Sequence, residues 1–361
     1  MLISIFRVWV LSFFILTVGH RQLVAQIENA GSFASVREKQ QLPCNNFRYE
    51  SRPLAPDMTA RFMQEDGRAI LTRPLFDGRL ALYQALDGSV RFLGELPPFT
   101  EITDVSKEGL VVGQVDYFTY AAASVYSIPD QLMVDLKNYS QSQEFSRALK
   151  ISQQGLIHFL SVDQIGLIDL QSRFFYNLGF YAHLETINHR DEVIFIVPND
   201  EETQVLYSNA QDPENAIVLT SCFGWKCAKQ AILNDSGLAA LRLGSWGIGR
   251  WSEKEGLKTF SLPSYLRNEW LILRGIDREG NILIEYSEDH FHLEYYLLTR
   301  SFDLFNLRDI SDLRSDFQFI FNFDSQFPNH KKMADNGDIL VTGDFRTREY
   351  PLPYFFKKKC F

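Results

Sequence analysis

The chain has 361 residues and a formal net charge of −9, and 14% of its residues are aromatic, including 30 phenylalanines. The surplus of acidic side chains argues against a partner held through its phosphate backbone, so no nucleic acid partner is expected. The apolar content is sufficient for a large core in one or two domains.

The first predicted element is an export signal. The positively charged start MLISIFR precedes the apolar run VWVLSFFILTVG at 8–19, and the polar HRQLVAQ follows. This order predicts a signal peptide over 1–25, an N-terminal linker over 26–43, and a periplasmic or extracellular mature protein. The alternative is an uncleaved membrane anchor, although the run is shorter than the roughly 20 residues of a spanning helix. No transmembrane helix is expected in the mature protein.

A turn followed by a short apolar run recurs along the rest of the chain. Six copies of this turn contain a glycine, and in a seventh copy Glu192 stands at the equivalent position. The glycines are Gly67, Gly109, Gly155, Gly237, Gly280 and Gly337. Most spacings lie close to 43 residues. Such a period indicates a repeated supersecondary unit.

Each repeat has the pattern of four short strands. Predicted first strands are 101–105, 147–151, 184–188, 231–234 and 274–277, and each precedes a turn and an apolar second strand. Third strands tend to contain or end near an aromatic residue, as at 80–83, 124–127, 204–207 and 249–252. The pattern predicts an all-β fold, a seven-bladed β-propeller with four antiparallel strands per blade.

The last blade is expected to be completed by the other end of the chain. Six blades fit between 58 and 306, whereas the seventh begins at KKMADNGDILVTG and lacks a fourth strand. The strand NNFRYESRPL at 45–54 precedes the first blade and would supply it, a 3+1 closure that leaves no open edge. One domain is therefore expected over 44–361, with a long insertion at 306–330 in which FQFIFNF could form an extra strand.

Four cysteines in an exported chain favour disulfides. Cys44 directly precedes the N-terminal strand and Cys360 directly follows the C-terminal one, so these two are expected to pair and to join the chain ends. Cys222 and Cys227 would then pair within one loop. A metal site is the rival interpretation, but the spacing lacks the two close cysteine pairs of most zinc sites.

The repeat resembles the HAF-type extracellular repeats of bacterial proteins. ITDVSKEGLVVGQ (102–114) and QAILNDSGLAALRLG (230–244) carry the first part of that unit, SVYS and QVLY the second, and FYNLG and RFLG the third. The resemblance covers 58–306 and weakens at Glu192. It implies an exported propeller with no defined catalytic residues.

A binding role is predicted for the face formed by two sets of connections, from second to third strands and from each fourth strand to the next blade. Long connections on a rigid scaffold are common binding sites, and aromatic rings beside charged groups suit sugar faces or protein partners. The candidates are Tyr117, Phe118, Tyr181, Trp225, Trp246, Trp270, His290, His292, Arg346 and Arg348. The expected partner is a glycan or an extracytoplasmic protein, and the protein is expected to be a monomer.

Motifs for chemistry are scarce. The sequence has no glycine-flanked serine elbow, phosphate-binding loop or metalloprotease helix. His290 and His292 with Glu288 or Asp289 could hold a metal, but no metal, cofactor or catalytic residue is expected. The rival hypothesis is a propeller hydrolase or lyase acting on polysaccharide, with Asp116, Glu185, Asp289 and His330 meeting at the channel mouth.

Overall fold

Short antiparallel strands dominate the computed structural model. It describes residues 47–360 except 56, 88, 98–100, 107, 118–119, 137–138, 140–145, 153–154, 162–164, 171, 173, 180–182, 198–202, 210–211, 223–227, 268–269, 288–292, 321–330 and 346–351. The chain divides into two units, Met1–Pro43 and Cys44–Phe361, and every described residue belongs to the second. The predicted signal peptide and linker thus lie outside the described residues. Across the described ranges, no helix has the length and apolar character needed to cross a membrane.

Five sheets each consist of four strands consecutive in sequence. The first two contain β2 (Thr59–Met63), β3 (Ala69–Pro74), β4 (Leu80–Leu86), β5 (Ser89–Leu96), and β6 (Glu101–Val105), β7 (Leu110–Tyr117), β8 (Tyr120–Ser127), β9 (Leu132–Asp135). The third and fourth contain β10 (Ser146–Ile151), β11 (Leu156–Ser161), β12 (Ile165–Asp169), β13 (Phe174–Gly179), and β14 (His183–Ile187), β15 (Glu192–Val197), β16 (Thr203–Asn209), β17 (Asp212–Cys222). The fifth contains β18 (Ala228–Leu233), β19 (Ala239–Leu243), β20 (Gly247–Ser252) and β21 (Gly256–Ser261), followed by the 3₁₀ turn η1 (Ser264–Leu266).

The sixth sheet has eight strands, in the order β1-β28-β27-β26-β24-β23-β22, and β25 pairs with β24 off this path. Its strands are β1 (Phe47–Pro53), β22 (Leu271–Ile276), β23 (Ile282–Ser287), β24 (Leu293–Leu298), β25 (Leu304–Asn306), β26 (Phe317–Phe319), β27 (Ile339–Phe345) and β28 (Leu352–Cys360). The extra strand expected inside the 306–330 insertion is present as β26, which pairs with β27. Phe317 and Phe319 are buried there in an apolar cluster.

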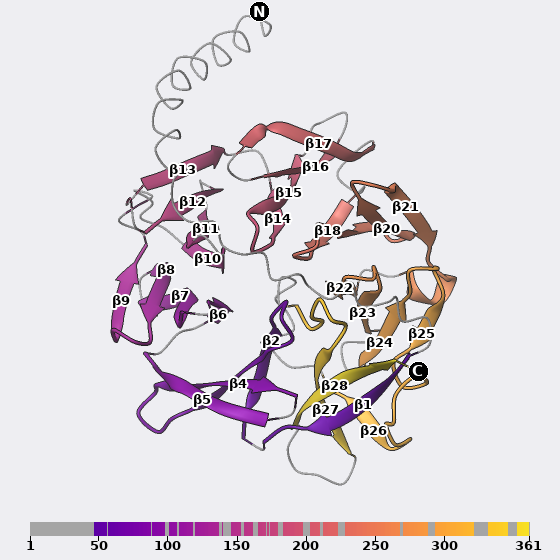
Figure 1. The fold of residues 1–361 in the computed structure, drawn as a ribbon, viewed down its shortest axis with the longest axis horizontal. Helices are drawn as coiled ribbons and strands as arrows, with labels where there is room; N and C mark the ends of the chain where they lie inside the picture. The colour runs from indigo at the N-terminus through magenta and orange to yellow at the C-terminus, as the bar shows by residue number, and fades with distance from the viewer. Residues whose placement is uncertain are drawn as a thin grey trace, which may run out of the picture. The chain divides into compact units, whose positions relative to one another are not determined.

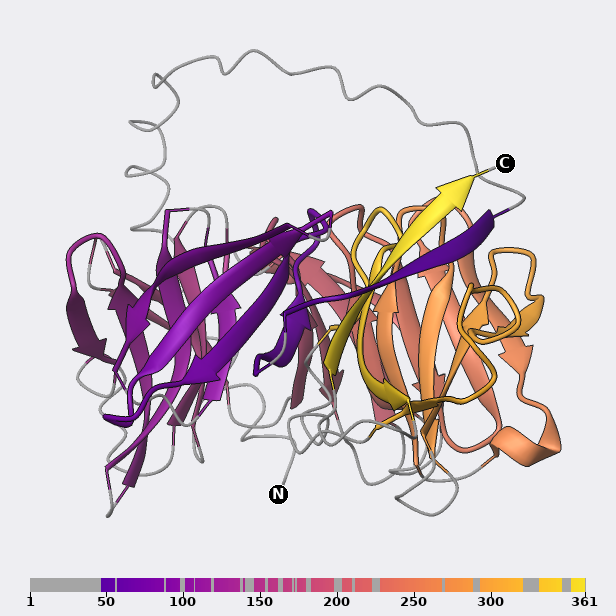
Figure 2. The ribbon, with the colours of Figure 1, turned by 90° about the horizontal axis from the view of Figure 1, so that it is seen from below.

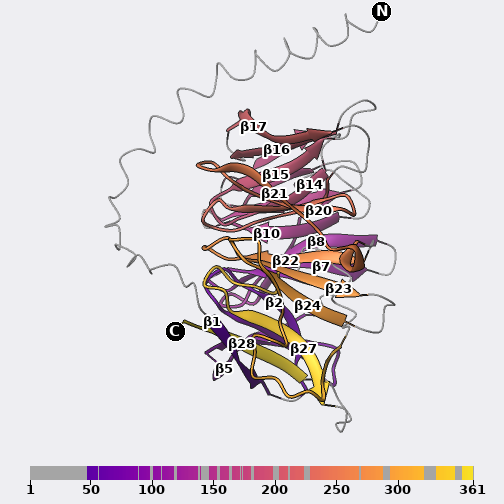
Figure 3. The same cartoon turned by 90° about the vertical axis from the view of Figure 1, so that its right-hand side faces the viewer.

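The sheets lie around a common centre, with β2, β6, β10, β14, β18 and β22 innermost (Figure 1). Their strands run between the two faces of this arrangement (Figure 3). Seven apolar clusters of buried side chains form the core, and most of them draw on two neighbouring sheets. One cluster joins the eight-stranded sheet to the first sheet through Leu340 and Phe355 on one side and Met63 and Leu71 on the other. The all-β fold and the four-stranded antiparallel sheets of a β-propeller are confirmed.

The seven described turns that directly precede β3, β7, β11, β15, β19, β23 and β27 share one geometry, and we call the end of the strands at which they lie the turn side. In each turn, the N–H of a residue with positive φ donates to the carbonyl three residues earlier. The residues are Gly67, Gly109, Gly155, Asp191, Gly237, Gly280 and Gly337. The prediction that Glu192 holds this place is wrong by one residue: Asp191 has φ 62°, and Glu192 begins β15. Aspartate can replace glycine because its short polar side chain tolerates the left-handed region.

The two ends of the described chain meet. β1 pairs antiparallel with β28 from Phe47 opposite Cys360 to Pro53 opposite Tyr354, and the two strands lie side by side (Figure 2). Cys360 is disulfide-bonded. Cys44 and Cys227 lie outside the described residues, as does the side chain of Cys222, so the predicted pairings stay predictions.

Candidate functional site

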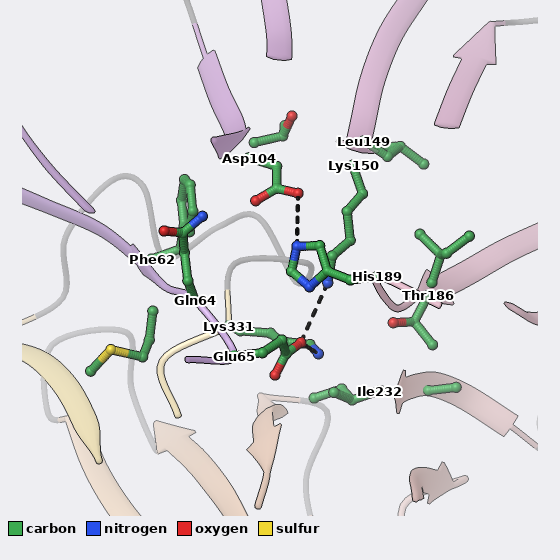
Figure 4. A pocket seen from close by; sticks show the side chains of 14 residues that line it. Phe62, Gln64, Glu65, Asp104, Leu149, Lys150, Thr186, His189, Ile232 and Lys331 are labelled. Atoms are coloured by element: carbon green, nitrogen blue, oxygen red, sulfur yellow. Dashed lines mark hydrogen bonds and ion pairs between the residues drawn. The ribbon is translucent and has the colours of Figure 1, made fainter. Parts of the chain in front are cut away.

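A central cavity of about 60 Å³ lies at the turn-side ends of the innermost strands. Its lining comes from five sheets and from Lys331 (Figure 4). Polar and charged side chains dominate the end nearest the turns: Gln64, Glu65, Asp104, Lys150, His189 and Lys331. Such a cavity can hold water molecules or a small polar ligand.

Glu65, directly after β2, accepts from two lysines. Lys150 of β10 lies 3.3 Å from its Oε1, and Lys331 contacts the same oxygen. The Lys331 ammonium also donates to the carbonyl of Leu233. Burial would raise the pKa of Glu65, but Lys331 and Lys150 together outweigh it and hold the pKa below its usual value. Glu65 is therefore a charged side chain that joins the first and third sheets.

His189, in the turn after β14, lies between two carboxylates. Its Nδ1 is 3.1 Å from Asp235 Oδ2, and its Nε2 is 3.6 Å from Asp104 Oδ2. Its backbone N–H also donates to Asp235 Oδ1 at 2.9 Å. Burial and Lys150 disfavour a charge on the ring, but the carboxylates of Asp104 and Asp235 outweigh them and raise the pKa of His189 above its usual 6.5. The ring thus links turns of the second, fourth and fifth sheets.

Asp335 adds a further carboxylate beside Glu65. Its backbone N–H donates to the Glu65 carbonyl at 3.0 Å, and its Oδ2 lies 3.4 Å from the guanidinium of the half-exposed Arg278. Burial, reinforced by the negative charge of Glu65, raises the pKa of Asp335 to about 9. Asp335 therefore carries a proton at neutral pH, which a neighbouring carboxylate can share.

Two chemical roles suit this group of side chains. As a network of buried ion pairs it ties together sheets that are distant in sequence, and removing any one partner would leave a buried charge unpaired. As a site, it offers carboxylate oxygens and an imidazole nitrogen next to a cavity. Glu65, Asp104 and Asp235 are paired with lysines or histidine, and Asp335 carries a proton. None of these carboxylates is therefore the free general base that a hydrolase needs.

Trp246 and Trp270, two predicted binding residues that the structure describes, lie in connections at the opposite ends of the strands, which we call the loop side. Phe118, Tyr181, Trp225, His290, His292, Arg346 and Arg348 lie outside the described residues. Tyr117 ends β7, but its side chain is outside the described part. Trp246 and Trp270 are both described and are 50% and 49% exposed.

Four exposed aromatic residues lie in loop-side connections within the described part of the chain. Trp246 lies in the turn between β19 and β20, Phe76 in the turn between β3 and β4, and Tyr265 and Trp270 in the connection from β21 to β22. Tyr265 is 59% exposed and Phe76 is fully exposed. The Leu262 N–H donates to the Trp246 carbonyl at 2.8 Å, which fixes the β19–β20 turn against the connection that carries Tyr265 and Trp270.

A layer of tyrosines supports this connection. The Tyr286 hydroxyl donates to the Tyr265 carbonyl at 2.6 Å. The rings of Tyr265 and Tyr286 lie 6.5 Å and 6.3 Å from that of Tyr296. Hydrogen bonds and ring contacts therefore hold the connection that carries the loop-side residue Tyr265.

The polysaccharide-cleaving alternative is neither supported nor opposed by the structure. The side chains of its candidate residues lie outside the described part of the chain: Asp116, Glu185, Asp289 and His330.

Sequence reasoning missed the charged cluster at the cavity because it looked for a site only among the long connections between strands. A signal was nevertheless present. Two residues before each positive-φ turn residue, a polar or charged side chain recurs, among them Glu65, His189, Asp235, Arg278 and Asp335. Comparing this turn position across the repeats marks these residues as a set of polar and charged side chains.

Comparisons with known proteins place the chain near several solved structures. No family model matches the sequence, and no curated protein does either. The chain is similar to a structure titled "YCF48 bound to D1 peptide", with a TM-score of 0.47, 10% identity, and coverage of 88% of this chain and 97% of that one. It is also similar to dipeptidyl peptidase 4 of Porphyromonas gingivalis, with a TM-score of 0.45 and 12% identity over 82% of this chain. A functionally unknown protein from Desulfotomaculum acetoxidans gives a TM-score of 0.43 and 13% identity, with 71% of this chain and 87% of that one covered. This chain spans 58% of the length of the peptidase.

Proposed function

We propose that the protein is an exported, seven-bladed β-propeller that binds a glycan or an extracytoplasmic protein through its loop side, without catalysis. The observation that carries the binding role is the set of exposed aromatic rings on that side. Large exposed rings on a rigid support bind sugar faces and protein anchors at little cost in conformational entropy.

The eight-stranded sheet supports the count of seven, because it divides naturally into two blades. β24 and β26 are joined by a single residue pair, Leu293 opposite Phe319. On one side lie β22, β23, β24 and β25, which follow one another as in the other sheets. On the other side, β27, β28 and β1 follow a short extended segment in which Met333 bridges Ile339. Pairing of β1 with β28 favours closure of the last blade by the N-terminal strand.

A binding role fits the loop side better than the turn side. The turn side ends in tight four-residue turns, and polar side chains of these turns donate to backbone carbonyls of the neighbouring sheet. The loop side has half-exposed rings whose backbone is held by hydrogen bonds, so that little ordering is needed when a partner binds. An extended chain, either a glycan or a peptide, would contact several of these rings at once.

The test is a binding screen on the full secreted protein. Affinity electrophoresis against a panel of soluble neutral and acidic polysaccharides tests for glycan binding. Surface plasmon resonance against purified envelope proteins tests for a protein partner. For the partner that binds, Trp246→Ala and Tyr265→Ala should each weaken affinity by at least about tenfold, as for central aromatic anchors. Phe92→Ala is the matched control, since Phe92 is 51% exposed but lies on the outer strand β5.

Two results would count against the proposal. Equal affinity of Trp246→Ala, Tyr265→Ala and Phe92→Ala would show that the partner binds elsewhere. Release of new reducing ends or unsaturated products from a bound polysaccharide would favour the hydrolase or lyase alternative.

A further inference from the structure

Three side chains of metal-binding type from three different sheets meet beside the central cavity, and two of them, Glu65 and His189, line it. Glu65 follows β2, His189 follows β14 and Asp235 follows β18, and one ligand atom of each lies within 4.8 Å of the others. Figure 4 shows Glu65 and His189 facing each other across the cavity. No local sequence pattern brings these residues together, so their approach is a property of the whole arrangement of sheets.

The polar groups at this point are not fully satisfied. Glu65 Oε2 is buried and has no hydrogen-bond partner among the described residues, and its side chain is only 6% exposed. The same holds for Oδ1 of the neighbouring Asp335, whose side chain is 1% exposed. Buried carboxylate oxygens without a donor are unfavourable and rare, and each signals a bound proton, water or cation.

The group contains more carboxylates than lysines. Glu65, Asp104, Asp235 and Asp335 lie with Lys150 and Lys331 around the ring of His189, and without an ion the charges balance because Asp335 and His189 hold protons. Arg278 also reaches Asp335, but it is 52% exposed at the edge of the group, where water screens its charge. A divalent ion would take the place of these two protons, since metal binding releases protons from the groups around it.

The distances suit a small ion. His189 Nδ1 and Asp235 Oδ2 are 3.1 Å apart. Two ligand atoms about 2.05 Å from a tetrahedral ion are separated by roughly 3.3 Å, so this pair needs little adjustment. A carboxylate oxygen of Glu65 lies within 4.8 Å of the ligand atoms of the other two residues and would complete the set.

We propose that Glu65, His189 and Asp235 bind a divalent transition-metal ion of the Zn²⁺ or Mn²⁺ type at the turn side of the central cavity. One imidazole nitrogen with two carboxylates suits these ions, whereas Mg²⁺ prefers an all-oxygen octahedral set. The cavity leaves a coordination position for water. The bound ion crosslinks the first, fourth and fifth sheets, independently of whether the loop side binds a partner.

The experiment uses the full chain after dialysis against a chelator. Isothermal titration with ZnCl₂ and MnCl₂, followed by metal analysis after gel filtration, should give one equivalent of tightly held ion, and thermal unfolding should shift upward because the ion binds only the folded state. MgCl₂ should give neither effect.

Variants separate this site from other metal-binding groups. Asp235→Asn and His189→Gln should weaken Zn²⁺ binding by at least about tenfold, whereas the double variant His290→Ala/His292→Ala should bind as the parent does. Lys331→Met removes a cation that competes for Glu65 and should bind Zn²⁺ more tightly, a gain that a purely structural ion pair would not produce. Near-UV circular dichroism confirms that each variant is folded.

Two outcomes overturn the proposal. One is the absence of a stoichiometric ion at Zn²⁺ concentrations of about 100 μM, far above those at which protein zinc sites fill. The other is an ion lost from the His290/His292 variant but retained by Asp235→Asn and His189→Gln.

Discussion

The side-chain amide of Asn188 donates to the backbone carbonyl of Asn234, 2.8 Å away, in the equivalent turn of the next sheet. The amide of Asn234 repeats this contact one sheet further on, since it donates to the carbonyls of Ile276 and Asp277 at 3.3 and 3.0 Å. The first sheet uses Gln64 in the same way, toward the carbonyl of Val105. These turn residues thus have two roles. They close the hairpin between the first and second strands, and they hydrogen-bond it to the adjacent sheet.

Replacing Asn234 by alanine should destabilise the protein by about 2–4 kcal/mol, because several buried hydrogen bonds are lost together. Its Oδ1 accepts from the N–H groups of Ser236 and Leu238, each at 2.9 Å, and its amide links two sheets. Urea denaturation measures the change. Ser236→Ala, at an exposed position of the same turn, is the control. If both variants unfolded at the same urea concentration, the link between sheets would have no energetic role.

Gly155 allows the cost of backbone conformation to be measured alone. It has φ 82°, and a Cβ added there would meet no atom within 4 Å. Gly155→Ala should therefore cost about 1–2 kcal/mol from the left-handed conformation only. Gly155→Asn should cost less, since asparagine tolerates this region. Chemical denaturation of both variants checks the order, and equal losses would point to a steric cause instead.

The repeat allowed most of the fold to be predicted, because a hairpin turn imposes a local requirement that shows in the sequence. Gly67, Gly155 and Gly280 were assigned to turns and have positive φ. The error at Glu192 arose from expecting a glycine or its aligned substitute, whereas the neighbouring Asp191 adopts the same conformation with φ 62°. When a repeat lacks the glycine, the sequence predicts the position of the residue with positive φ only to within one residue.

The site at the cavity could not be predicted in the same way. Glu65 is more than a hundred residues from both His189 and Asp235 in the sequence. Only the arrangement of the sheets around the centre brings one ligand atom of each within 4.8 Å of the others. The sequence does show that polar residues recur at one turn position, but it does not show that these positions face a common centre. Spatial convergence of distant repeats depends on how many sheets pack together and at what angle.

His158 should make stability depend on pH. It is fully buried in β11, and neither ring nitrogen has a hydrogen-bond partner in the part of the chain that the structure describes. Burial, with a smaller contribution from Lys150, lowers the pKa of His158 to about 3. Between that value and the usual 6.5, the unfolded chain binds a proton that the folded chain does not.

Stability should therefore fall as pH is lowered from about 6.5 toward 4, by up to about 1.4 kcal/mol per pH unit from this group. His158→Leu removes the titrating ring and keeps an apolar side chain of similar size. Urea denaturation at pH 7, 6, 5 and 4 should show a shallower loss in the variant than in the parent. Parallel curves would mean that His158 takes up its proton without unfolding.

Glu285 lies at the centre of a buried polar group. Arg274 donates to its Oε1 at 2.6 Å, and Lys332 and Tyr295 donate to its Oε2 at 2.9 and 2.7 Å. Burial would raise the pKa of Glu285, but Arg274 and Lys332 outweigh it and lower the pKa to about 2. Glu285→Gln leaves two buried cations without their counter-charge and should cost about 3–5 kcal/mol.

Glu255→Gln is the matched control. Lys258 and Arg300 lower the pKa of Glu255 to about 2 as well, but this carboxylate is at the surface, where solvent screens the pairs. Thermal unfolding should show a large loss for Glu285→Gln and almost none for Glu255→Gln. Similar losses in both variants would show that exposure does not decide the contribution of these ion pairs.

The bond made by Cys360 can be assigned by comparing single and double variants. Cys360 ends β28 opposite Phe47, and Phe47 lies three residues after Cys44. A bond to Cys44 would therefore hold the strand β1 to its neighbour β28. Cys44→Ser and Cys360→Ser should then each reduce stability, by up to about 5 kcal/mol for a loop of this length, and the double variant should be no less stable than either. Mass spectrometry after alkylation should find one newly reactive thiol in each single variant, Cys360 in the first and Cys44 in the second. If alkylation instead labels Cys222 or Cys227 in Cys360→Ser, the chain ends are held by strand pairing alone.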